Sequence, residues 1–191
     1  MEIYLIRHTT PKIDSGICYG QSDLDLINNY AEEISRVTSS IQTIKPEIYS
    51  SPLKRCTILA KSFNENIVLD SNLKEINFGD WELKAWNDID SEELNIWMKN
   101  FVFEKPPNGE SYIELSKRVN ESFDRIVTLS DSNKIIITHA GVIRAIIARL
   151  NNIDLKDSFK IKLEYGHIIK IVKDSSGLKI KEGLTIAECN S

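Results

Sequence analysis

Two short apolar runs, far apart in the chain, each end within two residues of a histidine. Residues 1–6 are followed by Arg7-His8, and residues 135–138 are followed by His139. Runs of this length and composition predict strands that are buried on both faces, as in a parallel sheet. Parallel strands end at the same edge of a sheet, where open α/β sheets bind their ligands. We therefore expect the two imidazoles to share one crevice.

The rest of the pattern predicts strands that alternate with helices. Further strands are expected at residues 48–49, 67–69, 158–165, 167–173 and 179–184. Helices are expected at residues 29–44, 52–63, 84–90, 91–101, 111–129 and 141–150. Ser51 is predicted to cap the second helix with Pro52 as its first residue, and Ser111 with Glu114 forms a capping box for the fifth. The alternation predicts an α/β fold with a mainly parallel central sheet and helices on both faces.

A single domain covering residues 1–191 is the simplest organisation, because a chain of this length supports one compact core. No repeat, low-complexity tract or linker divides the sequence. At about residues 81–107 we expect a helical, cap-like insertion over the crevice. Aromatic residues are frequent in and just after it: Trp81, Trp86, Trp97, Phe101 and Tyr112.

The composition excludes several classes of protein. Hydrophobic residues make up 41% and charged residues 27% of the chain, as in soluble globular proteins. A net charge of −4 predicts no attraction for nucleic acid or anionic membranes, and no run approaches the ~20 apolar residues of a membrane span. Without a signal-peptide pattern, the scattered Cys18, Cys56 and Cys189 predict free thiols in the cytoplasm. The expected partner is a small molecule, and a homodimer stays open.

The side chains around the first histidine suit phosphoryl transfer. His8 is the candidate nucleophile, because a neutral imidazole nitrogen attacks phosphorus and divides one difficult displacement into two easier ones. Arg7 and Arg55 offer planar pairs of donors that match phosphate oxygens. Arg55 also falls in the first turn of a predicted helix, where the helix dipole favours an anion.

The second histidine brings further donors to the same phosphate. His139 can donate a hydrogen bond to a phosphate oxygen. Ala140 and Gly141 are small, so that backbone N–H groups at the start of the next helix can approach the phosphate closely. Donors arranged in advance stabilise the charge on the transferring group, which is where most catalysis of phosphoryl transfer lies.

An acid must protonate the leaving oxygen, and Glu75 is the best candidate. A phosphate dianion beside this carboxyl favours its protonated form, because like charges oppose ionisation. Glu75 would act as an acid in the first step and as a base toward water in the second. Asp80 and Glu82 are the rival carboxylates.

Other phosphatase chemistries find no support in the sequence. A cysteine phosphatase needs an arginine six positions after the cysteine, but Leu24 follows Cys18 and Ser62 follows Cys56 at that distance. There is no glycine-rich loop of the nucleotide-binding type and no cluster with metal-ligand spacing. We therefore expect neither a cofactor nor a metal.

Five motifs that carry these residues resemble the histidine phosphatase (phosphoglycerate mutase-like) superfamily. They lie at residues 5–8, 51–56, 73–82, 109–111 and 138–141. The resemblance implies a three-layer sandwich in which His8 is the phosphorylated nucleophile and Glu75 the proton donor. It also implies that Arg7, Arg55 and His139 form the phosphate pocket. Gln21 matches a position whose side chain contacts the phosphoryl group in relatives.

Within the superfamily the chain looks most like the α-ribazole phosphatases of cobalamin biosynthesis. It shares with them an Arg-His-Thr triplet at residues 7–9 and a Gly-Ile-Cys-Tyr-Gly run at residues 16–20. Thr9 and Thr10 replace the Gly-Glu of most relatives, which disfavours a mutase, and Leu83 replaces a common glycine. The resemblance implies a phosphomonoester hydrolase that acts on α-ribazole 5′-phosphate or adenosylcobalamin 5′-phosphate.

Three alternative functions stay open. A broad-specificity phosphatase for small phosphoesters would use the same chemistry. A phosphoglycerate mutase usually has a longer chain with added loops, and a non-catalytic phosphate-binding module would be favoured if His8 or Glu75 were absent. The aromatic residues of the middle segment would suit a benzimidazole-like base by stacking, although most are expected in the core. His167 is expected to be structural.

Overall fold

The computed structural model describes residues 1–43 and 45–186. Within them a six-stranded sheet has the order β3-β2-β4-β1-β5-β6. Its strands are β1 (Glu2–Arg7), β2 (Glu47–Ser50), β3 (Ile67–Leu69), β4 (Lys134–Thr138), β5 (Ile168–Asp174) and β6 (Gly177–Glu182). The first four are parallel to one another, and β5 and β6 add an antiparallel hairpin at one edge. The expected α/β fold with a mainly parallel sheet is confirmed.

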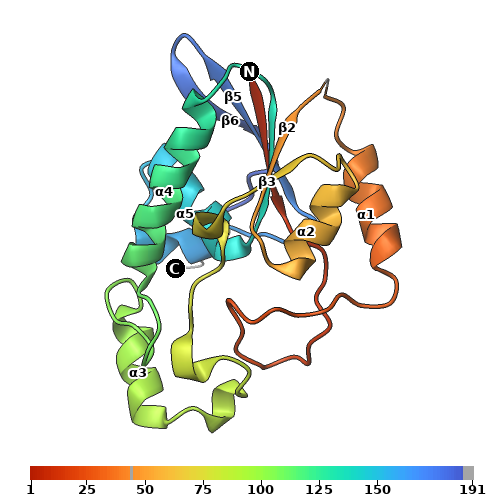
Figure 1. Ribbon diagram of the computed structural model, residues 1–191. Coiled ribbons are helices and arrows are strands. Elements are labelled where there is room, and N and C mark those ends of the chain that lie inside the picture. The colour runs from red at the N-terminus through yellow and green to blue at the C-terminus, as the bar shows by residue number, and fades with distance from the viewer. Residues whose placement is uncertain (44, 187–191) are drawn as a thin grey trace.

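Helices cover both faces of this sheet (Figure 1). They are α1 (Tyr30–Ser39), α2 (Lys54–Lys61), α3 (Ser91–Asn100), α4 (Tyr112–Thr128) and α5 (Ala140–Leu150), with short 3₁₀ turns η1 (Ser71–Leu73), η2 (Gly79–Trp81), η3 (Trp86–Asp88) and η4 (Leu155–Lys160). Strand β1 shows why helices are needed on both faces of the sheet, because its side chains alternate between the two faces. Ile3 and Leu5 join the core under α4 and α5, whereas Tyr4 and Ile6 join the core under α1 and α2.

The register of the sheet brings the two histidines together. Arg7, the last residue of β1, pairs with Thr138, the last residue of β4. The backbone N–H of His8 then donates to the carbonyl of Thr138 at 2.9 Å, and β4 continues directly into His139. Both imidazoles therefore leave the sheet from neighbouring strands at one end.

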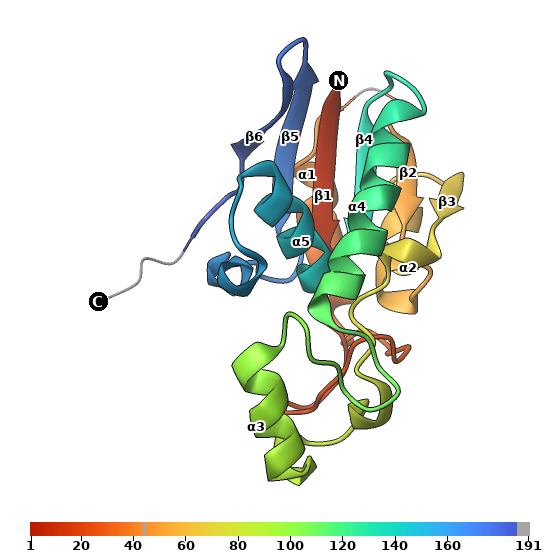
Figure 2. The ribbon, with the colours of Figure 1, turned by 90° about the vertical axis from the view of Figure 1, so that its left-hand side faces the viewer.

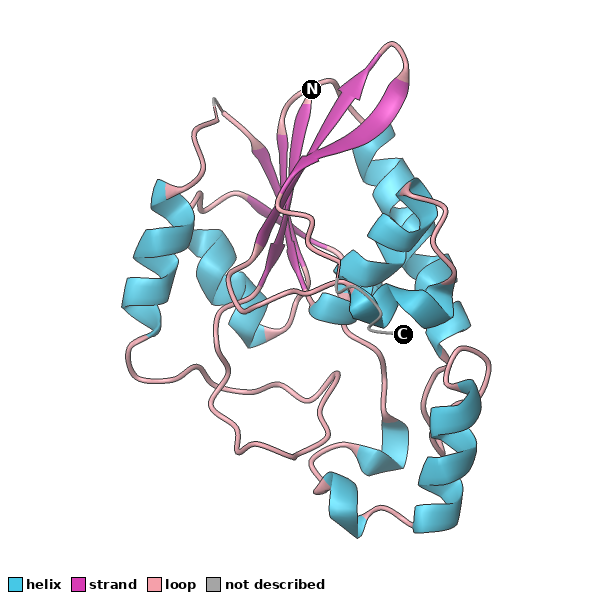
Figure 3. Ribbon diagram, turned by 180° about the vertical axis from the view of Figure 1, so that it is seen from behind, coloured by secondary structure: helices cyan, strands magenta, loops and turns pink. Residues whose placement is uncertain are grey.

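Several segments cross that end of the sheet. Helix α3 lies beyond the end of β1, in the green segment of Figure 2. The long loop between β1 and α1 reaches the same region (Figure 3). A small third core of buried Cys18, Trp81 and Ile89 holds this loop against the segment before α3.

The structure corrects some expected element boundaries. Helix α2 begins at Lys54 with Leu53 at its N-cap, so Pro52 is not its first residue. The Ser51 hydroxyl instead lies 2.8 Å from a nitrogen of His139. Helix α1 ends at Ser39, and the expected helix at 84–90 is only the 3₁₀ turn η3.

The expected strand at residues 158–165 is wrong, since this segment begins within η4. Its buried Ile161 and Leu163 pack against the core under α4 and α5. Their carbonyl groups accept hydrogen bonds from the side chains of Arg144 and Arg7 rather than from a full neighbouring strand. Ile161 forms one isolated bridge, to Ile186.

The remaining expectations concern thiols and membranes. Cys18 and Cys56 are buried free thiols, and Cys189 lies outside the described residues. Burial raises the pKa of both buried thiols to about 12. None of the helices in the described residues is both long enough and apolar enough to cross a membrane.

Candidate active site

A cavity of about 570 Å³ opens at the end of the sheet where β1 and β4 finish. Polar side chains line one part of it: Arg7, His8, Arg55, Glu75 and Arg144. Aromatic and other apolar side chains line the rest: Phe78, Trp86, Trp97, Met98, Phe101 and Phe159. We call these two parts the phosphate end and the aromatic end.

His8 is buried at the phosphate end, with its tautomer set by the backbone. Its Nδ1 lies 2.7 Å from the carbonyl oxygen of Thr9. A carbonyl only accepts, so Nδ1 carries the proton and Nε2 keeps its lone pair. Burial, assisted by the charges of Arg55 and Arg7, holds the pKa of His8 well below its usual value. The imidazole is therefore neutral near pH 7, as a nucleophile requires.

Two arginines flank His8, and the Nε–H group of each is unpaired. Arg55 is fully buried and donates from its terminal nitrogens to the carbonyls of Ser22 and Gly20. Arg7 donates to the carbonyl of Leu163, and its guanidinium lies 3.9 Å from the centre of the Tyr165 ring. The Nε–H groups of both arginines are buried without a hydrogen-bond partner among the described residues. A buried unpaired donor is unfavourable, and a phosphate oxygen would satisfy it.

His139 lies beside His8, with ring centres 5.1 Å apart. Its Nε2 contacts the Ser51 hydroxyl at 2.8 Å, and both ring nitrogens face the Cys56 sulfur at 3.5 and 4.0 Å. Burial and the charge of Arg55 hold its pKa well below the usual value. The ring is not part of the cavity lining, so its hydrogen bond goes to Ser51 and not into the cavity.

Glu75 reaches the same end from the loop after η1. Its carboxylate accepts the backbone N–H of Ile76 and that of Gly141 in the first turn of α5, both at 3.0 Å. A Cβ atom on Gly141 would lie 2.3 Å from Glu75 Oε1, so a larger residue here would displace the carboxylate from this position. The helix start that was expected to approach a phosphate thus holds the Glu75 carboxylate.

The rival carboxylates are placed elsewhere. Glu82 accepts the backbone N–H groups of residues 20–22, the Ser22 hydroxyl and the N–H of Phe78. Burial opposes its ionisation, but these hydrogen bonds outweigh burial and lower its pKa. Asp80 is exposed and accepts the Asn108 amide at 2.9 Å. Neither lines the cavity, which favours Glu75 as the acid.

Gln21 acts on Glu75 and not on the cavity in this structure. Its side-chain amide donates to the backbone carbonyl of Glu75 at 3.0 Å, and it does not line the cavity. Ala140 and Gly141 do line the cavity, beside Glu75. A substrate contact by Gln21 stays a prediction.

Arg144 is the polar residue at this site that the sequence analysis missed. It lines the cavity from α5, three residues after Gly141, and its guanidinium lies 5.1 Å from the Phe159 ring centre. Residues three apart share a helix face, so this spacing was the available signal. Tyr19 and Tyr165, whose hydroxyl groups are 2.7 Å apart, were also missed.

Ring contacts connect the aromatic end. Trp86 and Trp97 are stacked with centres 6.2 Å apart, and Phe78 meets Trp86 edge to face at 5.5 Å. Of the expected aromatic residues, Trp81 is buried in the small core and Tyr112 is buried with its hydroxyl near Ser158. In the described residues no group of three or more histidine, cysteine or carboxylate side chains is arranged to hold a metal ion.

A family model described as the histidine phosphatase superfamily (branch 1) matches residues 3–183. The chain belongs to this superfamily. A Hydrogenobacter thermophilus protein named as a candidate phosphoserine phosphatase is 28% identical, with 88% of each chain covered. The adenosylcobalamin/α-ribazole phosphatase of Escherichia coli is 25% identical, with 87% of each covered. These relationships support a phosphatase.

Among solved structures, the fold is similar to that of the α-ribazole phosphatase from Shigella flexneri. The TM-score is 0.86 at 22% identity, with 98% of each chain covered. A phosphoserine phosphatase mutant from Entamoeba histolytica gives a TM-score of 0.80 at 22% identity, with 95% of each chain covered. At these identities the likeness concerns the fold alone.

Proposed function

We propose that this histidine phosphatase hydrolyses phosphomonoesters through a phosphohistidine formed at Nε2 of His8. The observation that carries the proposal is the state of His8, which is neutral, has its Nδ1 proton bound to Thr9, and leaves Nε2 free. The unused Nε–H donors of Arg7 and Arg55 flank it. This combination supplies a nucleophile together with donors for the phosphoryl oxygens.

The reaction proceeds in two steps. In the first, Nε2 of His8 attacks phosphorus, the ester P–O bond breaks, and Glu75 gives its proton to the leaving alcohol. In the second, Glu75 takes a proton from water, whose oxygen attacks the phosphohistidine, and the P–N bond breaks to release inorganic phosphate. Arg7 and Arg55 bind the phosphoryl oxygens throughout. Ala140 offers its backbone N–H group, whereas the N–H of Gly141 holds the Glu75 carboxylate.

His139 has a supporting role in this proposal. Its ring packs against His8, and rotation of its side chain away from Ser51 would direct a nitrogen toward the phosphate. Gln21 supports Glu75 through the backbone carbonyl and contacts the phosphoryl group once substrate is bound. No metal or cofactor takes part.

For the substrate we propose α-ribazole 5′-phosphate or adenosylcobalamin 5′-phosphate. The aromatic end supports this choice, because a flat benzimidazole base stacks on indole and phenyl rings. The cavity volume of about 570 Å³ lies within the range of small-molecule sites, roughly 300–1,000 Å³. The named phosphatase of Escherichia coli adds a second line of support. The segment at residues 81–107 serves as a cap and carries four of the six residues that define this aromatic end.

A second candidate is a phosphatase for small polar phosphoesters such as phosphoserine. The specific observation in its favour is Arg144, which lines the cavity and whose guanidinium would pair with a carboxylate. The Hydrogenobacter thermophilus relative carries a name of this kind. A small polar ester would leave the aromatic end unused, which places this candidate second.

The deciding measurement compares kcat/KM for α-ribazole 5′-phosphate, phosphoserine and p-nitrophenyl phosphate, all in EDTA. A preference for the ribazole ester by a factor of about 100 or more supports the cobalamin assignment, because binding of remote groups is then used in the transition state. A preference for phosphoserine supports the second candidate. Similar low values of kcat/KM for all three esters would indicate a broad-specificity phosphatase. Activity that disappears in EDTA and returns with a metal would contradict the mechanism.

A further inference from the structure

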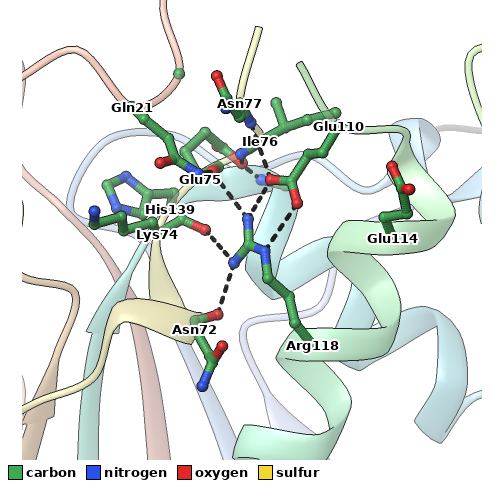
Figure 4. A network of polar contacts seen from close by, with 12 residues as sticks. Gln21, Asn72, Lys74, Glu75, Ile76, Asn77, Glu110, Glu114, Arg118 and His139 are labelled. Atoms are coloured by element: carbon green, nitrogen blue, oxygen red, sulfur yellow. Dashed lines mark hydrogen bonds and ion pairs between the residues drawn. The ribbon is translucent and has the colours of Figure 1, made fainter. Parts of the chain in front are cut away.

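Arg118, on α4, reaches the loop that carries Glu75 (Figure 4). One terminal nitrogen donates to the carbonyls of Asn72 and Lys74, at 2.8 and 2.9 Å. The other donates to the carbonyl of Glu75 itself at 3.0 Å. The Arg118 side chain thus binds three backbone carbonyl groups between residue 72 and Glu75, the proposed acid.

The same guanidinium pairs with Glu110. Its Nε donates to one carboxylate oxygen at 3.0 Å, and its Nη2 donates to the other at 2.5 Å. Together with the three carbonyls, these bonds use all five N–H donors that an arginine has. Lysine has no planar fork of this kind, so the arrangement requires arginine.

Glu110 holds the loop on the other side of Glu75. Its carboxylate accepts the backbone N–H of Asn77 at 3.0 Å, and its own N–H donates to the Asn77 carbonyl at 2.9 Å. A Cβ atom on Gly109 would lie 2.6 Å from that carbonyl oxygen, so glycine is needed for the close approach. The loop is therefore bound before and after Glu75 by one ion pair.

This ion pair is largely removed from water, with side-chain exposures of 20% for Arg118 and 16% for Glu110. Pairs at this depth are weak evidence for stability, because losing hydration offsets much of their attraction. Their geometric effect is stronger, since a bidentate pair fixes direction as well as distance. Here it fixes the loop from which the Glu75 side chain extends to Gly141.

We propose that Arg118 and Glu110 are positioning residues that hold the Glu75 carboxyl where it can protonate the leaving group. The inference rests on the proposed role of Glu75 as the acid. Neither residue lines the cavity, so both act through the loop and not on the substrate. A displacement of a catalytic group by about 1 Å can cost about 100-fold in rate, which sets the scale of the effect.

The test uses Arg118→Gln and Glu110→Gln with two esters. Glycerol phosphate has a poor leaving group that needs a proton, whereas p-nitrophenyl phosphate does not. We expect kcat/KM, which reports formation of the phosphohistidine, to fall about 10- to 100-fold for glycerol phosphate, with less than about a 3-fold change for p-nitrophenyl phosphate. The matched control is Arg149→Gln, which removes another bidentate arginine–carboxylate pair, with Asp124, and should change neither rate.

A double-mutant cycle separates positioning from a general structural role. If Arg118 acts through Glu75, the Arg118→Gln change should alter kcat/KM for glycerol phosphate by less than about 2-fold in a Glu75→Gln background. An undiminished loss in that background, or equal losses on both esters, would overturn the proposal. A Glu75→Gln variant that loses both esters equally would contradict the acid role instead, whatever the cycle shows.

Folding is checked by thermal unfolding of each variant. Should Arg118→Gln not fold, Arg118→Lys keeps the charge while losing the fork, and the same two-ester comparison and cycle apply to it. We expect Arg118→Lys to recover only part of the glycerol phosphate rate, because one ammonium group cannot bind the three carbonyls and Glu110 together. Full recovery would show that charge alone is needed and would overturn the positioning role.

Discussion

The phosphate end and the aromatic end of the cavity are built in different ways. At the phosphate end, His8 extends from a central strand next to the strand that carries His139, and Arg55 is fully buried with its terminal nitrogens bonded to backbone carbonyls. At the aromatic end, α3 contains no buried residue, and Met98 is 61% exposed. The first end inherits the rigidity of the sheet, whereas the second depends on ring contacts between short elements.

This difference assigns separate tasks to the two ends. Charged and hydrogen-bonded groups must hold a transition state to within fractions of an ångström, and a central sheet supplies that precision. Apolar rings recognise shape over a larger area and tolerate small movements, so they suit an exposed segment. Chemistry is thereby tied to the core of the fold, and the choice of substrate to its periphery.

Removing the nucleophile would produce the largest effect. We expect His8→Ala to lower turnover by on the order of 10⁴-fold or more, because the covalent route is lost. Phosphate release is the measurement, with circular dichroism to verify folding. His167→Ala is the matched control, since that ring bonds the Gly183 carbonyl in a turn and should leave activity intact. Near-wild-type release from His8→Ala would disprove the mechanism.

Replacing the acid should slow esters with poor leaving groups more than activated aryl esters. Glu75→Gln keeps the shape but has no proton to give, so we expect about a 10²- to 10⁴-fold loss on alkyl phosphates and a much smaller loss on p-nitrophenyl phosphate. The measurement is kcat/KM for both esters, because this quantity reports formation of the phosphohistidine and not its hydrolysis, in which Glu75 serves both esters as the base. Asp80→Asn is the control, because that carboxylate is exposed outside the cavity. If Asp80→Asn and not Glu75→Gln shows this difference between esters, the assignment of the acid is wrong.

Low pH should destabilise the folded protein through its two buried histidines. His8 and His139 both have lowered pKa values, mainly through burial, so the unfolded chain binds protons near pH 6.5 while the folded chain does not. The free energy of unfolding is therefore fully present above about pH 6.5 and falls below it, by up to about 1.4 kcal/mol per pH unit for each histidine.

Urea titrations between pH 7.5 and pH 5 measure this slope. A His139→Gln variant should show about half of it, because one titrating group is gone. The same depressed pKa keeps His8 neutral in mild acid, so kcat/KM should not fall with a midpoint near 6.5 on its account. A stability that rises as pH falls through 6.5 would contradict the buried neutral state of both rings.

The smallest expected effect lies at the aromatic end. Trp97→Ala removes a ring that stacks on Trp86, and we expect about a 10-fold rise in KM for α-ribazole 5′-phosphate. Phosphoserine, whose side chain is too small to reach the rings, should be unaffected. Equal changes for both esters would show that Trp97 supports the fold of the cap and not recognition of the base.

Much of the phosphate end could be predicted because buried strands are recognisable in the sequence as short apolar runs. The apolar runs before His8 and His139 required burial on both faces, and parallel pairing then placed their ends together. Glu75 was predicted as the acid before the family resemblance was considered, and its contact with Gly141 was not foreseen. The caps and ends of helices were less predictable, as Ser51 shows, since its hydroxyl contacts His139 instead of capping a helix that begins at Pro52.

Alone, the sequence determined the alternation of strands and helices, the two histidines at strand ends, and the family of the chain. Only the tertiary structure decided which groups bind one another: Arg118 with the loop of Glu75, Arg144 with the cavity, and the carbonyls of 161 and 163 with arginines instead of a strand. The physical reason is the distance along the chain over which each kind of interaction acts. Burial and periodicity act between neighbours in the chain, whereas a long side chain such as arginine finds partners that become near only after the layers have packed.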